Sequence, residues 1–207
     1  MFILRLLIIL LLTIHLNAFN NGPISEKIMK KAERKYGGKV INRFLKYNKL
    51  LAKIKPLDER NKLKIVNKFF NQVPYVRDIE NWKQEDYWAT PLEFLSRAKG
   101  DSEDFVIAKY FALKTSGVDT KKLYFTYVTS KERNEPHMVL SYFETPSSDP
   151  FILDNFNPNI LSAKDRDDLS PVYNFSPSSS SPQTKPSQHS THKKWEKLYK
   201  RVQRNKL

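Results

Sequence analysis

The sequence contains no cysteine among its 207 residues. A disulfide scaffold, a thiolate zinc site and a cysteine nucleophile are therefore excluded. Long apolar runs are also scarce, and the composition is 40% hydrophobic and 28% charged. These values exclude a chain that is disordered over most of its length and a multi-span membrane protein. What remains is a globular chain with room for about one domain.

Acidic residues are too few to balance the basic ones. Lys and Arg total 36 against 22 Asp and Glu, which gives a formal net charge of +14. Such a charge suits an anionic partner, so one hypothesis is a polyanion-binding protein. The basic residues are spread over every predicted helix and do not gather with aromatic residues in one stripe, so we expect no nucleic acid partner.

The N-terminal stretch is apolar but short. Met1–Ala18 has one basic residue, Arg5, followed by an unbroken apolar run over Leu6–Leu12. This run is shorter than the ~20 residues of a bilayer span, and a short apolar region that ends at a small residue is typical of a secretory signal. We predict a signal peptide over residues 1–18 and export to the periplasm. The alternative is an uncleaved N-terminal anchor, because Leu16 is bulky for a cleavage site.

Three amphipathic helices are expected after this segment. The first spans Ser25–Tyr36, with its first residue as N-cap and Gly37 after its end. The apolar stripe of the second runs over Val40–Ile54, and the third starts at Asp58 and ends before Pro74.

Two further helices are predicted after an aperiodic segment, residues 71–89, which we interpret as a loop. The residues Thr90–Glu93 combine an N-cap, a proline at the first helical position and a glutamate for a capping box. The second of these helices begins at Asp101 or Ser102 and runs to Gly117.

The pattern then changes to short segments rich in Tyr, Phe, Val, Ile and Leu, which predict strands. They are residues 123–129, 137–143, 151–154 and 172–175. Helices followed by antiparallel strands predict an α+β fold.

The C-terminal part differs in composition from this domain, which we place at residues 19–175. Residues 176–193 are rich in Ser and Pro and predict a flexible linker. Residues 194–207 form a basic amphipathic helix with Trp195 and Leu198 on one side. Docking on the domain, contact with an anionic surface and binding of a partner are all open, and we expect docking.

Only one histidine, His137, belongs to the predicted folded region. It begins one strand, and Asp154 ends another, where a carboxylate is well placed to orient an imidazole. Structural interpretations stay open for both residues. A single histidine at a strand start is commonly a surface or packing residue, and Asp154 followed by Asn155 can simply start a turn.

The segment Gly100–Asp104, with the sequence GDSED, opens a predicted helix. A nucleophile at a helix N-terminus gains from the partial positive charge there, which makes Ser102 a candidate. Ser and Asp are also the commonest N-caps, and acids favour the first turn, so the residues alone favour a capped helix start.

Several motifs stand in one order along the chain. They are YWATPLEFL (87–95), GDSED (100–104), IAKYFAL (107–113), NEPHMVL (134–140), LDN (153–155), RDDL (166–169) and PVY (171–173). Together they resemble the bacterial transglutaminase-like cysteine peptidases, the LapG-type periplasmic proteases that release biofilm adhesins. The resemblance covers about residues 40–175. It implies a papain/transglutaminase-like core, in which the helix carrying the nucleophile position packs on the antiparallel sheet.

The resemblance also assigns catalytic positions. The nucleophilic cysteine of the family falls at Ser102, and its His and Asp match His137 and Asp154. A serine hydroxyl is far less acidic than a thiol of pKa ~8.5, which closes the thiolate–imidazolium route. Serine can still attack if His137 takes its proton and an oxyanion hole is ready. Three interpretations are open: a pseudoenzyme that binds substrate, a genuine serine variant, or an altered sequence. The poor fit of an oxygen in a site shaped for sulfur favours the first.

Calcium dependence is a further property that the resemblance implies. The acidic ligands of the family correspond to Asp101 and Glu103, with Asp104 as a possible third ligand. Hard oxygen atoms clustered on one turn suit Ca²⁺, although acids in a first turn also serve the helix dipole. Trp88 and Asn155 are candidates for supporting the site or an oxyanion hole.

Two functions follow from the resemblance. The first is a periplasmic peptidase that cuts a large surface adhesin near its membrane-proximal end. The second is a catalytically silent homologue that binds such an adhesin, or an inner-membrane cyclic-di-GMP receptor, without cutting.

Overall fold

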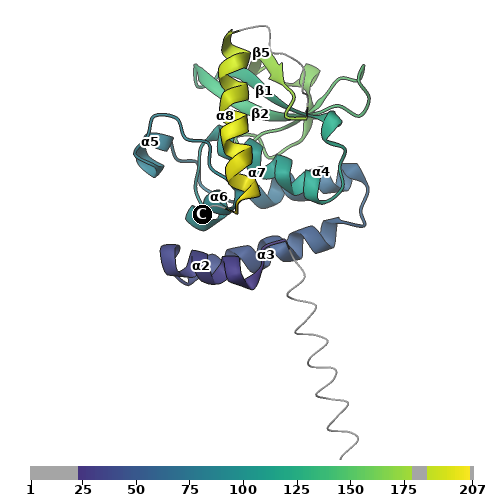
Figure 1. Cartoon of the computed structure of the whole chain (residues 1–207). Coiled ribbons are helices and arrows are strands. Elements are labelled where there is room, and N and C mark those ends of the chain that lie inside the picture. The colour runs from purple at the N-terminus through teal and green to yellow at the C-terminus, as the bar shows by residue number, and fades with distance from the viewer. Residues whose placement is uncertain (1–22, 179–185, 206–207) are drawn as a thin grey trace, which may run out of the picture.

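The computed structural model describes residues 23–178 and 186–205. One group of helices lies against a single antiparallel sheet, and the two N-terminal helices form a layer of their own that packs on other helices (Figure 1). The helices are α2 (Glu26–Tyr36), α3 (Lys39–Ile54), α4 (Glu59–Phe70), α5 (Asp78–Asn81), α6 (Pro91–Arg97), α7 (Ser102–Thr115) and α8 (Pro186–Gln203). Short 3₁₀ turns cover Thr120–Lys122 and Ala163–Asp165.

Helix starts follow the capping signals of the sequence. Asp58 caps α4 by accepting a hydrogen bond from the backbone N–H of Asn61. Thr90 and Glu93 form the predicted capping box at the start of α6. The five helices predicted between residues 25 and 117 are confirmed, but the segment predicted as a loop also contains the short helix α5.

The sheet has five strands in the order β4-β3-β2-β1-β5, with every neighbouring pair antiparallel. The strands are β1 (Leu123–Ser130), β2 (Glu135–Tyr142), β3 (Phe151–Leu153), β4 (Leu161–Ser162) and β5 (Leu169–Phe175). The four predicted strands are confirmed, whereas β4 has only two residues and no pattern in the sequence. The α+β prediction is therefore correct.

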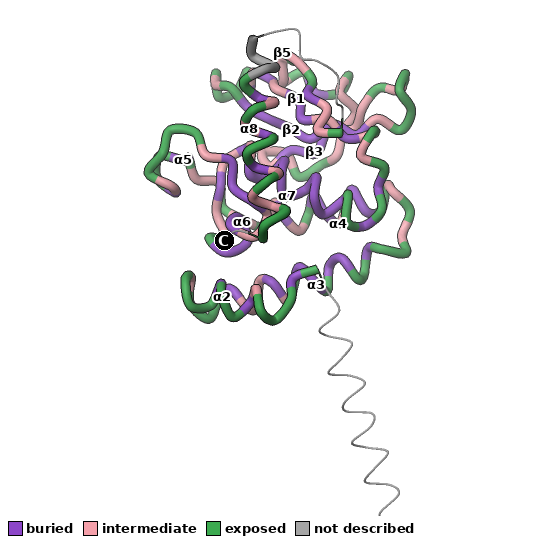
Figure 2. The backbone as a smooth tube through the Cα atoms, in the orientation of Figure 1, coloured by how far each residue is buried: buried purple, intermediate pink, exposed green. Residues whose placement is uncertain are grey.

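Helix α7 lies at the centre of the fold. Its residues Phe105–Leu113 are all buried, and it packs against β2 on one side and α4 on the other. Figure 2 shows that the outer helices, in contrast, alternate between buried and exposed residues. A helix enclosed on all sides holds its N-terminus in a fixed place, which is the property that the candidate site uses.

The C-terminal helix docks on the domain, as predicted. The Trp195 ring stacks on Phe111 at 5.7 Å and meets Phe125 edge-on at 5.4 Å, so α8 lies against both α7 and the sheet (Figure 1). The predicted boundary at residue 194 is wrong, because α8 begins at Pro186. Proline suits the first turn of a helix, and no proline or glycine interrupts the residues that follow it.

Every helix within the described ranges is too short or too polar to span a bilayer. The predicted signal peptide, residues 1–18, lies outside the described residues, as do residues 179–185 of the predicted linker.

Candidate functional site

The two strands β2 and β3 bring His137 and Asp154 together. Leu140 pairs with Leu153, so the beginning of β2 and the residue after β3 lie at the same end of the sheet. His137 Nε2 is 2.8 Å from Asp154 Oδ1, and the exposed fractions of the two residues are 4% and 1%. A pair this deeply buried holds the imidazole ring in one orientation.

Asp154 is itself held by other groups. Its Oδ2 accepts a hydrogen bond from Arg166 Nη2 at 2.7 Å, and its Oδ1 accepts one from the backbone N–H of Phe156 at 2.9 Å. Arg166 is fixed in turn by Asp168, whose two oxygens lie 2.8 and 2.6 Å from Nε and Nη2. Sequence reasoning placed Arg166 only within a motif and gave it no role, because nothing local shows that it reaches Asp154.

These contacts decide the protonation state of the pair. Burial alone would raise the pKa of Asp154, but the hydrogen bonds from His137 and Arg166 hold it well below its ordinary value. The ionised carboxylate therefore accepts a hydrogen bond from Nε2–H. In the tautomer that this contact selects, the lone pair of the imidazole lies on Nδ1. Phe156 stacks on the ring at 4.6 Å and keeps it in plane. The arrangement can serve as a general base through Nδ1.

Ser102 is the first residue of α7 and follows the N-cap Asp101. It is 6% exposed, and α7 packs against the strand that carries His137. The Ser102 hydroxyl donates a hydrogen bond to Glu103 Oε2 at 2.7 Å. In this structure the hydroxyl proton therefore points to a carboxylate of the next residue.

Three carboxylates form an acidic cluster beside this helix start. Oxygen atoms of Asp78, Asp101 and Asp104 all lie within 4.8 Å of one another. Glu103, which the sequence suggested as a ligand, is not a member of this group, and its carboxylate contacts Ser102. Asp78 was missed because the segment that contains it has no periodic pattern and no local signal links it to α7.

A backbone contact explains how Asp78 reaches the cluster. Tyr75 forms a parallel bridge with Gly100, and the N–H of Val76 donates to the carbonyl oxygen of Gly100 at 2.8 Å. This bridge places the start of α5 next to the N-terminus of α7.

The acidic cluster is electrostatically uncompensated. Burial, followed by the charges of Glu103, Asp104 and Asp78, raises the pKa of Asp101 to about 10. Burial raises the pKa of Asp78 to about 6, against the lowering effect of its hydrogen bonds with Tyr87 and Asp101. Burial also raises the pKa of Asp104 well above its ordinary value. One oxygen of Asp78 accepts from the N–H of Tyr87 at 2.5 Å, and one of Asp104 accepts from the N–H of Ala89 at 2.7 Å.

The other oxygens of Asp78 and Asp104 are buried and have no hydrogen-bond partner among the described residues. Hard, closely spaced oxygen atoms that lack a partner are the ligands that Ca²⁺ prefers. The residues present therefore fit a calcium ion.

Two donors named from the sequence are also buried without partners. The indole nitrogen of Trp88 and the amide nitrogen of Asn155 make no hydrogen bond within the part of the chain that the structure describes. Unused buried donors are what an oxyanion hole requires.

Comparison with known proteins gives matches in family and in fold. A family model described as bacterial transglutaminase-like cysteine proteinase BTLCP matches residues 48–200. A solved structure of Legionella pneumophila LapG is 40% identical, with a TM-score of 0.71, and the match covers 85% of this chain and 96% of that one. An EGTA-treated structure of that protein gives the same values. A calcium-bound structure is 38% identical, with a TM-score of 0.70 and coverage of 86% and 98%. No curated protein matches the chain.

Proposed function

Since the chain belongs to the bacterial transglutaminase-like cysteine proteinases, we propose that it acts on a surface adhesin in the periplasm through a LapG-type peptidase site. The observation that carries the proposal is the buried pair of His137 and Asp154, fixed by Arg166. A surface or packing histidine has no need of an ionised carboxylate that is itself held by a buried arginine.

In the proposed reaction, Ser102 is the nucleophile and His137 is the base. The hydroxyl turns from Glu103 to Nδ1 of His137, which takes the proton as the oxygen attacks the scissile carbonyl carbon. Asp154 stabilises the imidazolium. His137 then donates the proton to the amide nitrogen as the C–N bond breaks, and water hydrolyses the acyl-enzyme by the same route. Trp88 and Asn155 are the proposed donors to the oxyanion.

A serine nucleophile makes peptide-bond cleavage at this site slow. The hydroxyl cannot form the thiolate that drives a cysteine peptidase, and in the resting structure its proton is directed to Glu103. This hydrogen bond favours a second candidate function, in which the chain binds the adhesin, or an inner-membrane cyclic-di-GMP receptor, without cutting.

We further propose that Asp78, Asp101 and Asp104 hold Ca²⁺, and that Glu103 stays with Ser102. The proposal rests on the orphan oxygens of the acidic cluster and on the calcium-bound structure of the relative. A bound cation would supply positive charge that compensates the three carboxylates of the acidic cluster, two of which are buried.

The test is cleavage of the membrane-proximal region of the adhesin from the same organism, by wild type, Ser102→Ala, Ser102→Cys and His137→Ala, with calcium or with EGTA. We expect Ser102→Cys to cut roughly 100-fold faster than wild type or more, because a thiol beside an imidazole ionises readily. Ser102→Ala and His137→Ala should not cut, and EGTA should abolish cleavage. Ser116→Cys, a buried serine at the other end of α7, is the matched control for a new thiol.

The outcomes separate the two functions. Cleavage by wild type that is lost in Ser102→Ala establishes a serine-dependent peptidase. Cleavage by Ser102→Cys alone, with binding of the adhesin by wild type, establishes the binding role. Failure of every variant to bind or cut the adhesin in calcium would contradict the proposal.

A further inference from the structure

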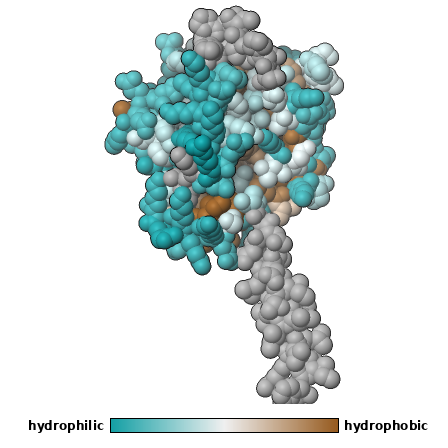
Figure 3. Space-filling model, viewed as in Figure 1, coloured by the Kyte–Doolittle hydropathy of each residue, from teal (hydrophilic) through white to brown (hydrophobic). Residues whose placement is uncertain are grey.

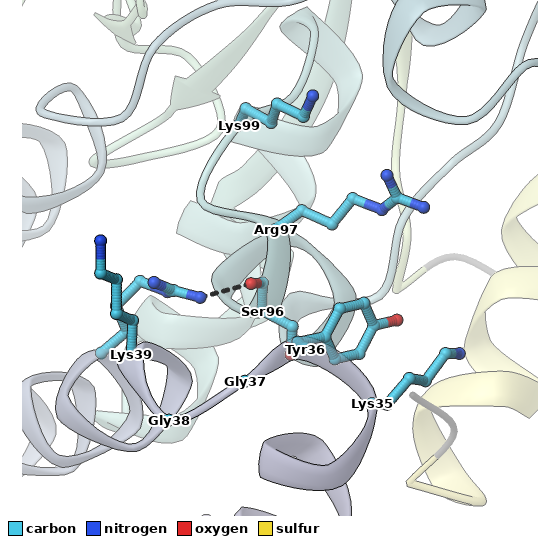
Figure 4. A pocket seen from close by; sticks show the side chains of 9 residues that line it. Lys35, Tyr36, Gly37, Gly38, Lys39, Ser96, Arg97 and Lys99 are labelled. Atoms are coloured by element: carbon cyan, nitrogen blue, oxygen red, sulfur yellow. Dashed lines mark hydrogen bonds between the residues drawn. The ribbon is translucent and has the colours of Figure 1, made fainter.

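A second hollow lies away from the acidic cluster, where the turn between α2 and α3 meets the end of α6. Its volume is about 690 Å³, and its lining comes from these three helices, the turn between α2 and α3, and Lys99 just after α6 (Figure 4). Five of the lining residues are cationic and none is acidic: Lys35, Lys39, Arg43, Arg97 and Lys99. A hollow lined by charges of one sign attracts ligands of the other.

The two arginines of the hollow are held in place by backbone oxygens. Arg43 donates from Nε to the carbonyl oxygen of Leu95 at 2.7 Å and from Nη2 to that of Ser96 at 2.5 Å. Arg97 donates to the carbonyl oxygen of Asn81 at 2.7 Å and stacks over the Trp82 ring at 4.2 Å. These uncharged partners position both guanidinium groups and leave their positive charge uncompensated.

The lysines add charge that can adapt to a ligand. In Figure 4, Lys39 lies on one side of Ser96, while Lys35 and Arg97 lie on the other. Neither Lys39 nor Lys99 forms an ion pair with any described residue, whereas Lys122 and Lys194 each do. Gly37, at the turn between the helices, has a φ of +82°, and a Cβ built there meets nothing within 4 Å, so the mouth is open.

A buried hydroxyl lies in the wall of the hollow. Ser96 lines the hollow and is 2% exposed, and its Oγ has no hydrogen-bond partner among the described residues. Buried hydroxyl groups are normally hydrogen-bonded. The Oγ is closed off from the hollow itself, so it would reach a ligand there only after a change of the Ser96 rotamer.

The surroundings strengthen the local charge. The segment 26–55, which forms α2 and α3, contains eleven Lys or Arg residues and only two Glu. Hydrophilic side chains also predominate on the face of the molecule shown in Figure 3. The positive field around the hollow is therefore a property of the whole α2–α3 layer and not of one side chain.

We propose that this hollow binds a phosphate-bearing ligand. Arginine forks and lysine ammonium groups are the donors that phosphate oxygens favour. The nearest carboxylate that the structure places at this hollow is Glu33, beside Gly38, and it forms no ion pair with Arg43, Lys39 or Lys99. The volume falls within the range of about 300–1,000 Å³ that is common for small-molecule sites. The phosphate can belong to a soluble molecule or to a phospholipid headgroup, and the two sources share the same recognition chemistry. None of the lining residues is part of the peptidase-type site.

The test measures binding of pyrophosphate, a soluble probe, to the full chain by isothermal titration calorimetry at about 0.15 M salt. The hollow variant is Lys39→Gln with Lys99→Gln. The matched control is Lys53→Gln with Lys55→Gln, which removes the same charge from exposed positions at the other end of α3 and the residue after it. We expect saturable binding by wild type and the control, with at least tenfold weaker binding by the hollow variant.

A second arm identifies the source of the phosphate by sedimentation with vesicles. Vesicles of phosphatidylcholine alone are compared with vesicles that contain phosphatidylglycerol. Binding to the anionic vesicles that the hollow variant loses supports a headgroup ligand, whereas pyrophosphate binding without that loss supports a soluble one. Absence of saturable pyrophosphate binding, or equal weakening in the hollow and control variants, would overturn the proposal, because only diffuse attraction would then remain.

Discussion

At the scale of single residues, Gly100 has no room for a side chain. A Cβ at this position would lie 2.6 Å from Asp104 Oδ2 and 2.8 Å from Phe94 Cδ2. The same residue bridges to Tyr75 and so brings Asp78 to the acidic cluster. One glycine therefore permits both the burial of Asp104 and the approach of the α5 segment.

We predict that Gly100→Ala lowers the free energy of unfolding by about 1–3 kcal/mol, the usual cost of overpacking a core. Urea denaturation of the variant and the wild type measures the difference. Gly38→Ala is the control, since a Cβ there would meet only Glu33 Oε1 at an ordinary 3.7 Å. Equal stability of Gly100→Ala and Gly38→Ala would show that Asp104 and Phe94 move aside freely.

Lys109 is the other residue whose environment is unusual. It is fully buried in α7, and its Nζ has no hydrogen-bond partner among the described residues. Burial lowers its pKa to about 7, against a partial opposing effect of the Asp154 carboxylate. Lys109 therefore lies close enough to Asp154 to feel its charge, and its amine changes protonation state near physiological pH.

This shift predicts a specific pH dependence of stability. Between about pH 7 and pH 10.5 the unfolded chain binds a proton at Lys109 that the folded chain does not. Burial of the charged Lys109 therefore lowers the free energy of unfolding by its full amount below pH 7, and this loss becomes smaller as the pH rises. We expect Lys109→Met to be more stable than wild type, and the difference to be larger at pH 6.5 than at pH 9.5 by up to about 3 kcal/mol.

Urea denaturation at the two pH values checks this expectation. Groups that titrate in both proteins cancel in the comparison. Lys114→Met, an exposed lysine on the same helix, should show a difference from wild type that does not vary with pH. A pH-independent difference for Lys109→Met as well would mean that the buried amine stays charged in the folded protein.

At the scale of secondary-structure elements, α8 is connected to the acidic cluster through one loop. Arg201 of α8 donates hydrogen bonds to the hydroxyl of Tyr87 and the carbonyl oxygen of Trp88, and it lies over the Tyr87 ring at 4.6 Å. In the same loop, the backbone N–H of Tyr87 donates a hydrogen bond to Asp78, and that of Ala89 donates one to Asp104. The helix therefore stabilises the loop that supports the carboxylates.

We predict that Arg201→Met releases this loop while α8 stays docked through Trp195 and Leu198. Amide hydrogen exchange of residues 87–89 should become at least about tenfold faster, because local opening loses charge-assisted hydrogen bonds. Hydrogen-exchange mass spectrometry measures the rates. Arg204→Met, which changes an exposed arginine at the end of the same helix, should leave them unchanged. Unaltered exchange in Arg201→Met would contradict a clamping role.

At the scale of the whole molecule, the sequence predicts elements that have a strong local signal. The capping box at Thr90, the apolar stripe of α3 and the apolar strands all appear where the patterns place them. The two-residue strand β4 and the four-residue helix α5 were missed, because such short elements depend on neighbours and not on periodicity. The start of α8 was also misplaced, since its polar first residues are helical only as an extension of a docked helix.

The residues of the candidate site also fall into those that the sequence indicates and those that it does not. The relation of His137 to Asp154 follows from two adjacent antiparallel strands, so the sequence could indicate it. The contributions of Asp78 and Arg166 depend on contacts between distant segments, and no spacing in the sequence reveals them. The hollow at the α2–α3 turn belongs to the same class, because its cations come from three helices and from Lys99, just after α6.

The position of α8 in the chain also sets the order in which the molecule can be completed. Its contact with the loop at Tyr87 joins residues 114 positions apart, and α8 follows every other described element. The acidic cluster and the His137–Asp154 pair can form before α8 docks, but the loop at Tyr87 gains its contact with Arg201 only afterwards. A folding chain that has not yet docked its last helix therefore has an assembled site whose supporting loop is not yet stabilised.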